Sequence, residues 1–488
     1  MEIVGRLTRN AGFVFIAGLA EKTFFFFSFA YAARILGPAD FGVYALIGTF
    51  MFFIDMFSAF GVNPLAVREI SKHKEQAEEI FSRLFSLKFL FVLIAYPVVV
   101  LSAYGLGYGD RCRNLIHIAG VTAAITAMSG TFGVLYMGLE MFMVPSVVKI
   151  LVSFLHAASN VVVLYLGYGL EGMVWVALLG SVAGLAISAV WVRRKIIPYR
   201  FRFDFAPLKD LFLQSVPFSF LAFFQQAQSY LTILLLSVLP GPLEGKVAVG
   251  YYNPSLSIGR AVMMIPGGFH QAAMPAVSAN ADDREIVTSI INSATQTFLP
   301  VIIFPLILAT TFFPREIISL VFGPAYLPSA RALTILGWAF SLQVFNAPVT
   351  ATLAASREIR RFVPWAGLVF CISIVLCVPL VIYYSFVGAA VAYLVSMIVE
   401  TIIRHHLLRV VWGIRTTGTQ NHLLKSALVI AMACLALGVA RSFAFGSPAL
   451  LVMAVLLYAF CVMFYAQFRE GVLILVNGMI GRGLARNS

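Results

Sequence analysis

Two basic residues lie deep inside apolar stretches of the chain. Arg260 occurs in YYNPSLSIGRAVMMIPGGFHQ (Tyr251 to Gln271), within a longer run, Val247 to Asn280, that has no other charge, and Lys22 lies near the middle of another such stretch. A charge within a membrane costs about 2.5 to 3.5 kcal/mol on insertion scales and usually faces a cavity or a charged partner. Arg260 and Lys22 are therefore candidates for binding an anionic ligand, and guanidinium is well suited to phosphate oxygens.

Acidic residues offer a competing explanation for these cations. Glu21 and Asp55 are the acids deepest in apolar stretches. Either can exchange a coupling cation or proton, but either can equally be a structural counter-ion to Lys22 or Arg260. Two further basic residues, Lys88 and Lys149, lie nearer the ends of their stretches, where we expect their long side chains to extend toward the membrane surface.

A polar stripe runs along the stretch 211 to 238. Its members are Gln225, Gln228, Ser229 and Thr232, which have the i, i+3, i+4, i+7 spacing of one helix face. Amides and hydroxyls on that face can bond to the polar groups of a ligand, or they can hydrogen-bond to neighbouring helices. A shorter stripe comprises Gln343, Asn346 and Thr350, and for it we favour bonds between helices.

The motifs predict no metal, no cofactor and no catalysis. The five cysteines, at 112, 371, 377, 434 and 461, have neither the spacing of metal ligands nor that of a disulfide framework. The sequence also lacks a Gly-rich phosphate loop, an HExxH motif and paired acids at a helix end. We therefore expect a binding or transport protein rather than an enzyme.

The elements that position these residues are membrane-spanning helices. The chain is 61% hydrophobic and 11% charged, whereas roughly a quarter of the residues in soluble domains are charged. Its apolar runs have the length of about 20 residues that one crossing requires. The fold class is an all-α integral membrane protein with fourteen spans, near 11 to 33, 41 to 64, 84 to 108, 114 to 138, 143 to 166, 170 to 192, 211 to 238, 247 to 279, 286 to 312, 329 to 355, 362 to 384, 386 to 408, 424 to 441 and 447 to 468.

The basic residues predict the orientation. With the N-terminus inside, the cytoplasmic segments carry 23 lysines and arginines and the outer segments carry 7. Because positively charged loops stay cytoplasmic, both termini are expected inside a multi-pass protein of the plasma (inner) membrane. The net charge of +13 is thus explained mostly by topology, and no nucleic-acid partner is expected. The first stretch carries Glu21 and Lys22 and is longer than a signal core, so we expect an uncleaved helix.

Short echoes along the chain predict an internal repeat. Phe41-Gly42-Val43-Tyr44 opens the second span, and Val249-Gly250-Tyr251-Tyr252 opens the eighth, 208 residues later. Val144-Pro145 is echoed by Val363-Pro364, and Gly172 by Gly388, at offsets of 219 and 216. We expect two parallel six-helix lobes, 1–209 and 210–410, with helices 13 and 14 and a short cytoplasmic tail in 411–488.

Four segments resemble a known family. They are AARILGPADFGVYAL (Ala32 to Leu46), VREIS (Val67 to Ser71), VFGPAYLPSARALTIL (Val321 to Leu336) and LAASREIRRF (Leu353 to Phe362). They are similar to segments of polysaccharide-transporter proteins, the oligosaccharide-lipid flippases of the multidrug/oligosaccharidyl-lipid/polysaccharide exporter superfamily. The resemblance implies a V-shaped two-lobed bundle that moves a polyprenyl-pyrophosphate-linked oligosaccharide from the cytoplasmic to the outer leaflet for surface polysaccharide biosynthesis.

Three functions stay open at this point. For the flippase, the expected partners are the lipid-linked oligosaccharide, membrane lipids and a glycan polymerase or ligase machinery. A multidrug or metabolite cation antiporter of the same fold is the second reading, but Lys22 and Arg260 oppose a cation-binding cavity. A membrane-embedded glycan polymerase or ligase is the third, and it would require a long outer loop with catalytic residues, which the sequence does not offer.

Overall fold

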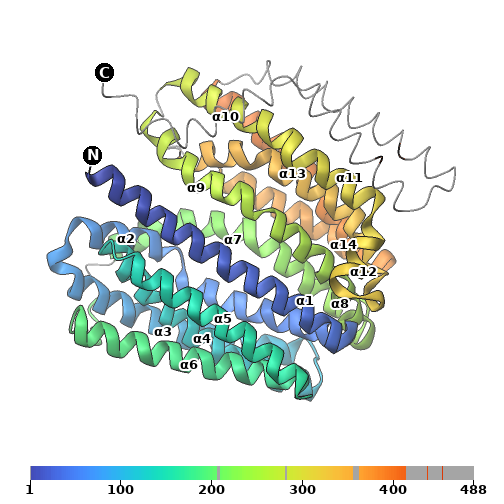
Figure 1. The fold of residues 1–488 in the computed structure, drawn as a ribbon, viewed down its shortest axis with the longest axis horizontal. Helices are drawn as coiled ribbons and strands as arrows, with labels where there is room; N and C mark the ends of the chain where they lie inside the picture. Colours follow the sequence, from blue (N-terminus) through green and yellow to red (C-terminus); the bar gives the residue numbers. More distant parts are fainter. Residues whose placement is uncertain are drawn as a thin grey trace. The chain divides into compact units, whose positions relative to one another are not determined.

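The computed structural model describes residues 2–205, 209–280, 283–355 and 362–413, together with residues 437 and 453. Within these ranges every regular element is helical and there is no strand (Figure 1). The α-helices are α1 (Glu2–Ala59), α2 (Val62–Lys72), α3 (Ala77–Gly105), α4 (Asp110–Gly138), α5 (Met143–Tyr165), α6 (Gly169–Lys195), α7 (Lys209–Val238), α8 (Pro242–Val262), α9 (Met264–Ala279), α10 (Arg284–Phe298), α11 (Phe304–Phe312), α12 (Pro314–Phe322), α13 (Ser329–Ala355) and α14 (Val363–Trp412). Three short segments complete the set, the 3₁₀ turns η1 (Lys74–Gln76) and η4 (Pro324–Tyr326) and the π-helical turn η3 (Leu299–Ile303).

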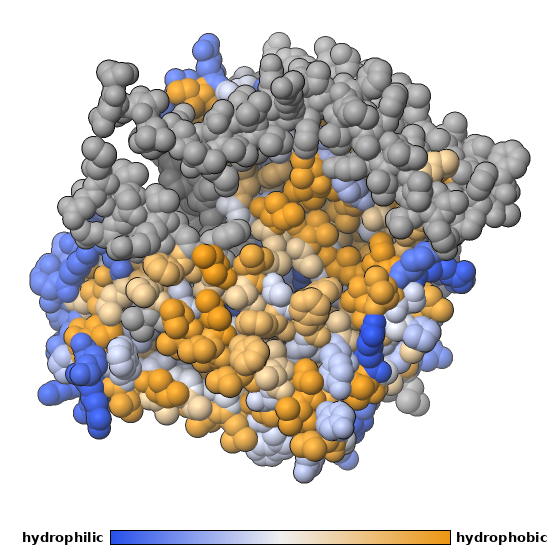
Figure 2. Space-filling view, in the orientation of Figure 1, coloured by the Kyte–Doolittle hydropathy of each residue, from blue (hydrophilic) through white to orange (hydrophobic). Residues whose placement is uncertain are grey.

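Eight stretches of the described chain are long and apolar enough to cross a membrane. Two of them, Ile16–Ala59 and Val363–Val410, are 44 and 48 residues long, about twice the length that one crossing requires. Each contains one residue with non-helical backbone angles, Gly37 in α1 and Ser385 in α14, and each therefore holds two of the predicted spans. The protein is an all-helical, multi-pass membrane protein. Along the helices of α1 to α6 the visible surface is largely hydrophobic, and hydrophilic residues gather toward both ends of the view (Figure 2).

The first twelve predicted spans all coincide with helices of the structure. The second predicted span, 41 to 64, extends too far, because Phe60 and Gly61 take positive φ angles and end α1 before the short helix α2 begins. The eighth is two helices, since the chain departs from α-helix at Met263, shortly before Pro266. Pro266 accounts for this break, because proline removes a backbone hydrogen bond and its ring kinks a helix. The last two predicted spans, 424 to 441 and 447 to 468, lie outside the described residues.

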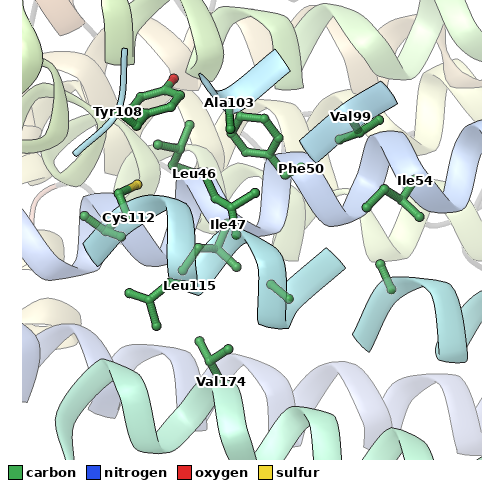
Figure 3. Close-up of a cluster of buried hydrophobic side chains, with 14 of the residues drawn as sticks. Leu46, Ile47, Phe50, Ile54, Val99, Ala103, Tyr108, Cys112, Leu115 and Val174 are labelled. Carbon is green, nitrogen blue, oxygen red and sulfur yellow. The ribbon is translucent and has the colours of Figure 1, made fainter. Parts of the chain in front are cut away.

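The chain forms two compact units. The first comprises Met1–Pro254, Val321–Tyr326 and Arg360–Ala389, and the second comprises Ser255–Leu320, Leu327–Ile359 and Ala390–Ser488. The core of the first unit joins four helices, with Leu46, Ile47, Phe50 and Ile54 from α1, Val99 and Ala103 from α3, Cys112 and Leu115 from α4, and Val174 from α6 (Figure 3). In the second unit, Phe298, Ile303 and Ile307 pack against Val344 of α13. Packing of this kind, rather than expulsion of water, holds helices together in a membrane.

Within the first unit, the start of α8 crosses α1 just after its kink. A Cβ added to Gly42 would overlap the carbonyl oxygen of Lys246, and one added to Gly250 would overlap the carbonyl oxygen of Pro38. Only glycine permits so close an approach of two backbones. Gly42 and Gly250 are 208 positions apart, and so are Pro38 and Lys246. The contact is therefore reciprocal between positions that the predicted repeat makes equivalent. Because it joins helix ends that are predicted to be outside, we call it the outer crossing.

Two tyrosines of the first unit make a second reciprocal pair of contacts. Tyr108, between α3 and α4, shares a 2.6 Å hydrogen bond with Ser237 at the end of α7. Tyr326, just before α13, donates a 2.8 Å hydrogen bond to the carbonyl oxygen of Ala33 before the kink of α1. Both tyrosine side chains are buried. Each tyrosine precedes the fourth helix of one predicted lobe and contacts the end of the first helix of the other.

Two sets of ion pairs lie at the ends of the first unit's helices. Arg111 bonds to Asp40 at 2.8 Å and to Glu171 at 2.6 Å. Asp40 and Arg111 belong to connections predicted to be outside, and Glu171 is at the start of the sixth predicted span, on the same side. The other set comprises Lys74–Glu140 at 3.1 Å, Arg83–Glu79 at 2.7 Å, Arg83–Asp204 at 3.5 Å and Arg202–Glu79 at 3.4 Å. Its members come from connections predicted to be cytoplasmic, so the pairing agrees with alternate crossings of the membrane.

Candidate substrate site

Arg260 lies in the last turn of α8, in the second unit, and its side chain is exposed. The helix stops two residues later and α9 begins at Met264, so the last carbonyl groups of α8 carry partial negative charge beside Arg260. A cation in the last turn of a helix is stabilised by about 0.3–1 kcal/mol. The break that the prolines produce thus gives Arg260 a favourable position while leaving its side chain accessible to a ligand.

Lys22 is likewise exposed, on α1 in the first unit. Its neighbour Glu21 forms a 2.8 Å ion pair with Lys149 of α5, in which both side chains are about half exposed. The Glu21 carboxylate already pairs with Lys149, and this argues against the structural explanation in which Lys22 pairs with Glu21. Lys22 thus belongs to the first unit and Arg260 to the second.

Lys88 is the intramembrane cation whose environment differs most from the prediction. We expected its side chain to extend toward the membrane surface, but it is buried, with 3% of its surface exposed. Its charge interacts with that of Asp55, which lies on α1 after the kink. Asp55 is thus a candidate counter-charge to this buried lysine. Its use as an ion-coupling group stays a prediction.

The four residues of the α7 stripe differ in exposure. Gln225 is exposed and Ser229 is half-buried, whereas Gln228 and Thr232 are buried. The Thr232 hydroxyl donates to the backbone oxygen of Gln228 at 2.9 Å, and Cys377 of α14 bonds to Thr232. The Gln228 side-chain nitrogen has no hydrogen-bond partner among the described residues. Gln225 and Ser229 are available to a ligand, whereas Thr232 holds helices together.

The shorter stripe belongs to a polar network between α13 and α14 in the second unit. Asn346 donates to the hydroxyl of Thr401 at 2.7 Å. Arg404 donates both to the hydroxyl of Thr350 and to the carboxylate of Glu400. Hydrogen bonds between helices, the use we favoured for Asn346 and Thr350, are present. Their partners could not be identified from the sequence alone, because Glu400 and Arg404 are near a predicted cytoplasmic end.

A pocket that the sequence reasoning missed lies along α10. It has a volume of about 470 Å³ and is lined by Arg284, Glu285, Thr288, Ser289, Asn292, Ser293 and Gly413. The signal was the spacing of polar residues at i and i+4 along the helix, which leaves Val287, Ile291 and Ala294 buried on the other face. None of the predicted site residues lines this pocket. The described residues hold no cluster of His, Cys, Asp and Glu that could bind a metal ion.

Known proteins are similar to this chain in sequence and in fold. It is 24% identical over 413 residues to a protein of Haloferax volcanii named as a low-salt glycan biosynthesis flippase, covering 82% of this chain and 83% of that protein. It is 22% identical over 393 residues to a Shigella flexneri protein named as an O-antigen transporter, covering 77% of this chain and 91% of that protein.

Among the solved structures that resemble this chain are two with a TM-score above 0.6. One is the lipid II flippase MurJ in an inward closed conformation, with a TM-score of 0.66 and 17% identity over 93% of this chain and 98% of that one. The other is an inward-facing multidrug resistance MATE transporter of the MOP superfamily, with a TM-score of 0.65 and 15% identity over 80% and 94%. These similarities show the fold alone. Residues 7–280 match the family described as polysaccharide biosynthesis protein, and because this is more than half of the chain, the protein belongs to that family.

Proposed function

We propose that this protein flips a polyprenyl-pyrophosphate-linked oligosaccharide from the cytoplasmic to the outer leaflet of the plasma membrane, for surface polysaccharide biosynthesis. The observation that carries the proposal is similarity along most of the chain to two proteins named for glycan flipping and O-antigen transport. Both relatives are covered over more than four fifths of their own length. A polymerase or ligase would act on the product at the outer face.

Two parallel six-helix lobes, 1–209 and 210–410, followed by two further helices in 411–488, are the architecture that we propose. The outer crossing supports this repeat, because its two glycines and their two contacts are related by one offset. A third pair of equivalents behaves alike. A Cβ on Gly172 or on Gly388 would overlap the end of the preceding helix, at Val163 and at the Leu380 carbonyl oxygen respectively.

Alternating access follows naturally from such a pair of lobes. The outer crossing and the two tyrosine contacts join the predicted outer ends of α1, α7 and α8 within one unit. We propose that these contacts exist while the protein accepts substrate from the cytoplasmic side, and that they separate when it releases substrate outside. Both termini are then cytoplasmic.

For the substrate, we propose a cationic cavity in which Arg260 pairs with the pyrophosphate and Lys22 completes the clamp. The guanidinium group stays charged and presents a planar set of donors to phosphate oxygens. Gln225 and Ser229 contact the sugar, with Gln228 and Thr232 behind them. Asp55 and Glu21 are the candidates for ion coupling. Two cations rather than a dense cluster suit a ligand that is bound and then released.

A deletion strain tests the function. Without this protein, a surface polysaccharide should be lost while its lipid-linked precursor accumulates on the cytoplasmic leaflet. Normal surface glycan together with new sensitivity to cationic dyes would favour the antiporter instead.

Variants tested in that strain then address the clamp. Arg260→Ala should abolish flipping with the protein still inserted, Arg260→Lys should keep part of it, and Lys22→Ala should be damaging but milder. Arg315→Ala, an exposed arginine of α12, is the matched control and should be fully active. An Arg260→Ala variant that is stable and fully active would refute the cationic cavity.

A further inference from the structure

The segment between α6 and α7, which is predicted to be cytoplasmic, alternates aromatic and charged residues. Residues 196–205 read IIPYRFRFDF, and we call them the strap. From Tyr199 onward, rings stand at every second position and Arg200, Arg202 and Asp204 stand between them. The backbone has no helical turn there. An extended chain places alternate side chains on opposite sides, so the strap has one aromatic edge and one charged edge.

The strap is fixed to α3 through its own backbone. The N–H groups of Arg200 and Arg202 donate to the hydroxyls of Ser82 and Ser86 at 3.2 and 2.8 Å. Two residues of an extended chain advance about 6.6 Å, and four residues of a helix advance about 6.0 Å, so the two spacings match. Near a membrane this pairing has particular value, because backbone polar groups need partners where water is scarce.

Aromatic and ionic contacts hold the two edges in place. The Tyr199 ring packs against those of Phe81 and Phe85 at centroid distances of 5.3 and 5.4 Å, and the Phe201 ring lies 5.5 Å from that of Phe89. Arg202 pairs with Glu79, and Asp204 pairs with Arg83. The strap is therefore a preformed surface that follows the first three turns of α3.

What the strap leaves exposed is suited to a membrane surface. Phe201 and Phe203 are 54% and 57% exposed. Four cations are exposed as well, Arg200 and the adjoining Arg193, Arg194 and Lys195 in the last turn of α6. No acidic side chain among the described residues pairs with these four. Exposed rings prefer the interface between lipid and water, and juxtamembrane cations attract anionic headgroups.

We propose that the strap and the last turn of α6 form a binding surface for the headgroups of anionic phospholipids in the adjacent leaflet. The exposed phenylalanines enter the acyl boundary, and the four cations bind the lipid phosphates. Anionic phospholipids are the occupant because they far outnumber any lipid-linked sugar in a membrane, so mass action favours them. This proposal is independent of the transport function and holds equally for an antiporter.

Native mass spectrometry of the full-length protein, titrated with phosphatidylglycerol or phosphatidylcholine, tests the proposal. Wild-type protein should prefer phosphatidylglycerol. One cation near a surface contributes roughly fivefold to such binding, so Arg194→Gln with Arg200→Gln should weaken phosphatidylglycerol binding by about ten- to thirtyfold. The control is Arg315→Gln with Arg331→Gln, which removes two exposed charges from connections predicted to be outside, and it should change binding by less than about twofold.

Three results would overturn the proposal. The first is equal binding of the two phospholipids by wild-type protein. The second is an equal loss of binding in the strap variant and the control. The third is a strap variant that keeps its phosphatidylglycerol binding but loses binding of a polyprenyl pyrophosphate, which would assign the surface to the substrate. Unchanged thermal stability in detergent verifies that each variant is folded.

Discussion

The outer crossing and the strap both join segments of the first unit, but their chemistry is opposite. At the crossing, the backbones of α1 and α8 touch through two glycines, and no charge takes part. Along the strap, two serine hydroxyls, a row of rings and two ion pairs together fix the segment to α3. A contact made of bare backbone is lost when one carbon atom is added, whereas a contact made of many side chains weakens by degrees.

The largest effect on transport is therefore expected when one methyl group is added at the outer crossing. Gly42→Ala and Gly250→Ala each place a methyl group on a carbonyl oxygen of the facing helix. Overpacking of a close contact costs about 1–3 kcal/mol, and here the neighbouring atoms are backbone and cannot rotate away. We expect each variant to lose more than about tenfold in glycan flipping, measured by complementation at equal protein abundance.

Gly48→Ala is the matched control for this experiment. Gly48 lies on the same helix, and a Cβ there meets no atom within 4 Å. Alanine should be tolerated or slightly stabilising at that position, since it favours helix. Equal activity of Gly42→Ala and Gly48→Ala would show that the crossing does not matter for transport. A large difference between Gly42→Ala and Gly250→Ala would argue against the repeat.

Smaller effects are expected from the tyrosine contacts. Tyr108→Phe and Tyr326→Phe each remove one hydrogen bond, worth about 1 kcal/mol, which is roughly a fivefold shift toward separation of the predicted outer ends. Cys112 is buried in the same core as Tyr108 (Figure 3) and reports this opening. In a chain that keeps only Cys112, an impermeant maleimide added outside should react about fivefold faster in either variant.

Two further variants sharpen the tyrosine experiment. The double variant should react about 25-fold faster, because contributions to one equilibrium add in free energy. Tyr104→Phe is the control, since its hydroxyl bonds to His117 at 2.8 Å on an exposed surface rather than at the crossing. If Tyr104→Phe accelerates the reaction as much as Tyr108→Phe, then the tyrosine contact does not control access to Cys112.

Much of this arrangement could be predicted from patterns that repeat along the chain. Apolar runs of similar length predicted twelve spans that coincide with helices of the structure, because a membrane forces each crossing to be helical and of similar length. The echo of Gly42 in Gly250 was visible as well, and the structure supplies its reason in the reciprocal contact. The break between α8 and α9 also has a local cause in the sequence, since Pro266 follows it directly.

Other features depended on which residues meet, and a single sequence does not contain that information. Lys88 resembles Lys149 in sequence position, yet one is buried beside Asp55 and the other pairs with Glu21 at an accessible surface. The α7 stripe has the spacing of one helix face, but the spacing does not reveal that Gln225 is exposed whereas Thr232 is buried. The strap was counted only as positive charge, because its meaning comes from Ser82 and Ser86 more than a hundred residues earlier.

A modest effect is expected when the strap is released from α3. Ser82→Ala with Ser86→Ala removes the acceptors of the Arg200 and Arg202 N–H groups and leaves the rings in place. Amide hydrogen exchange of a peptide covering the strap should accelerate by about five- to tenfold, since each bond contributes about 1 kcal/mol. Ser102→Ala, on the same helix, is the control because its hydroxyl bonds only to Val99 of its own turn. An unchanged exchange rate would mean that the rings alone hold the strap.

The smallest effects are expected from pH and salt, and they separate the two regions most cleanly. Burial raises the pKa of Tyr108 to about 12 and raises that of Tyr326 well above its usual range. A tyrosine with a raised pKa stays a neutral donor below its unfolded pKa of about 10, and its contribution is lost only as the pH rises through the raised value. From pH 6 to 9, the Cys112 labelling rate, divided by that of denatured protein at the same pH, should stay constant within about twofold.

Salt should not change that ratio either, because no charge takes part in the crossing. Binding of phosphatidylglycerol to the strap should instead fall with added salt, as the screening length shortens from about 10 Å at 0.1 M to about 3 Å at 1 M. A labelling ratio that changes with salt would mean that an ionic contact, rather than the tyrosines, holds the outer ends together. The nearest candidates for such a contact are the pairs of Arg111 with Asp40 and Glu171.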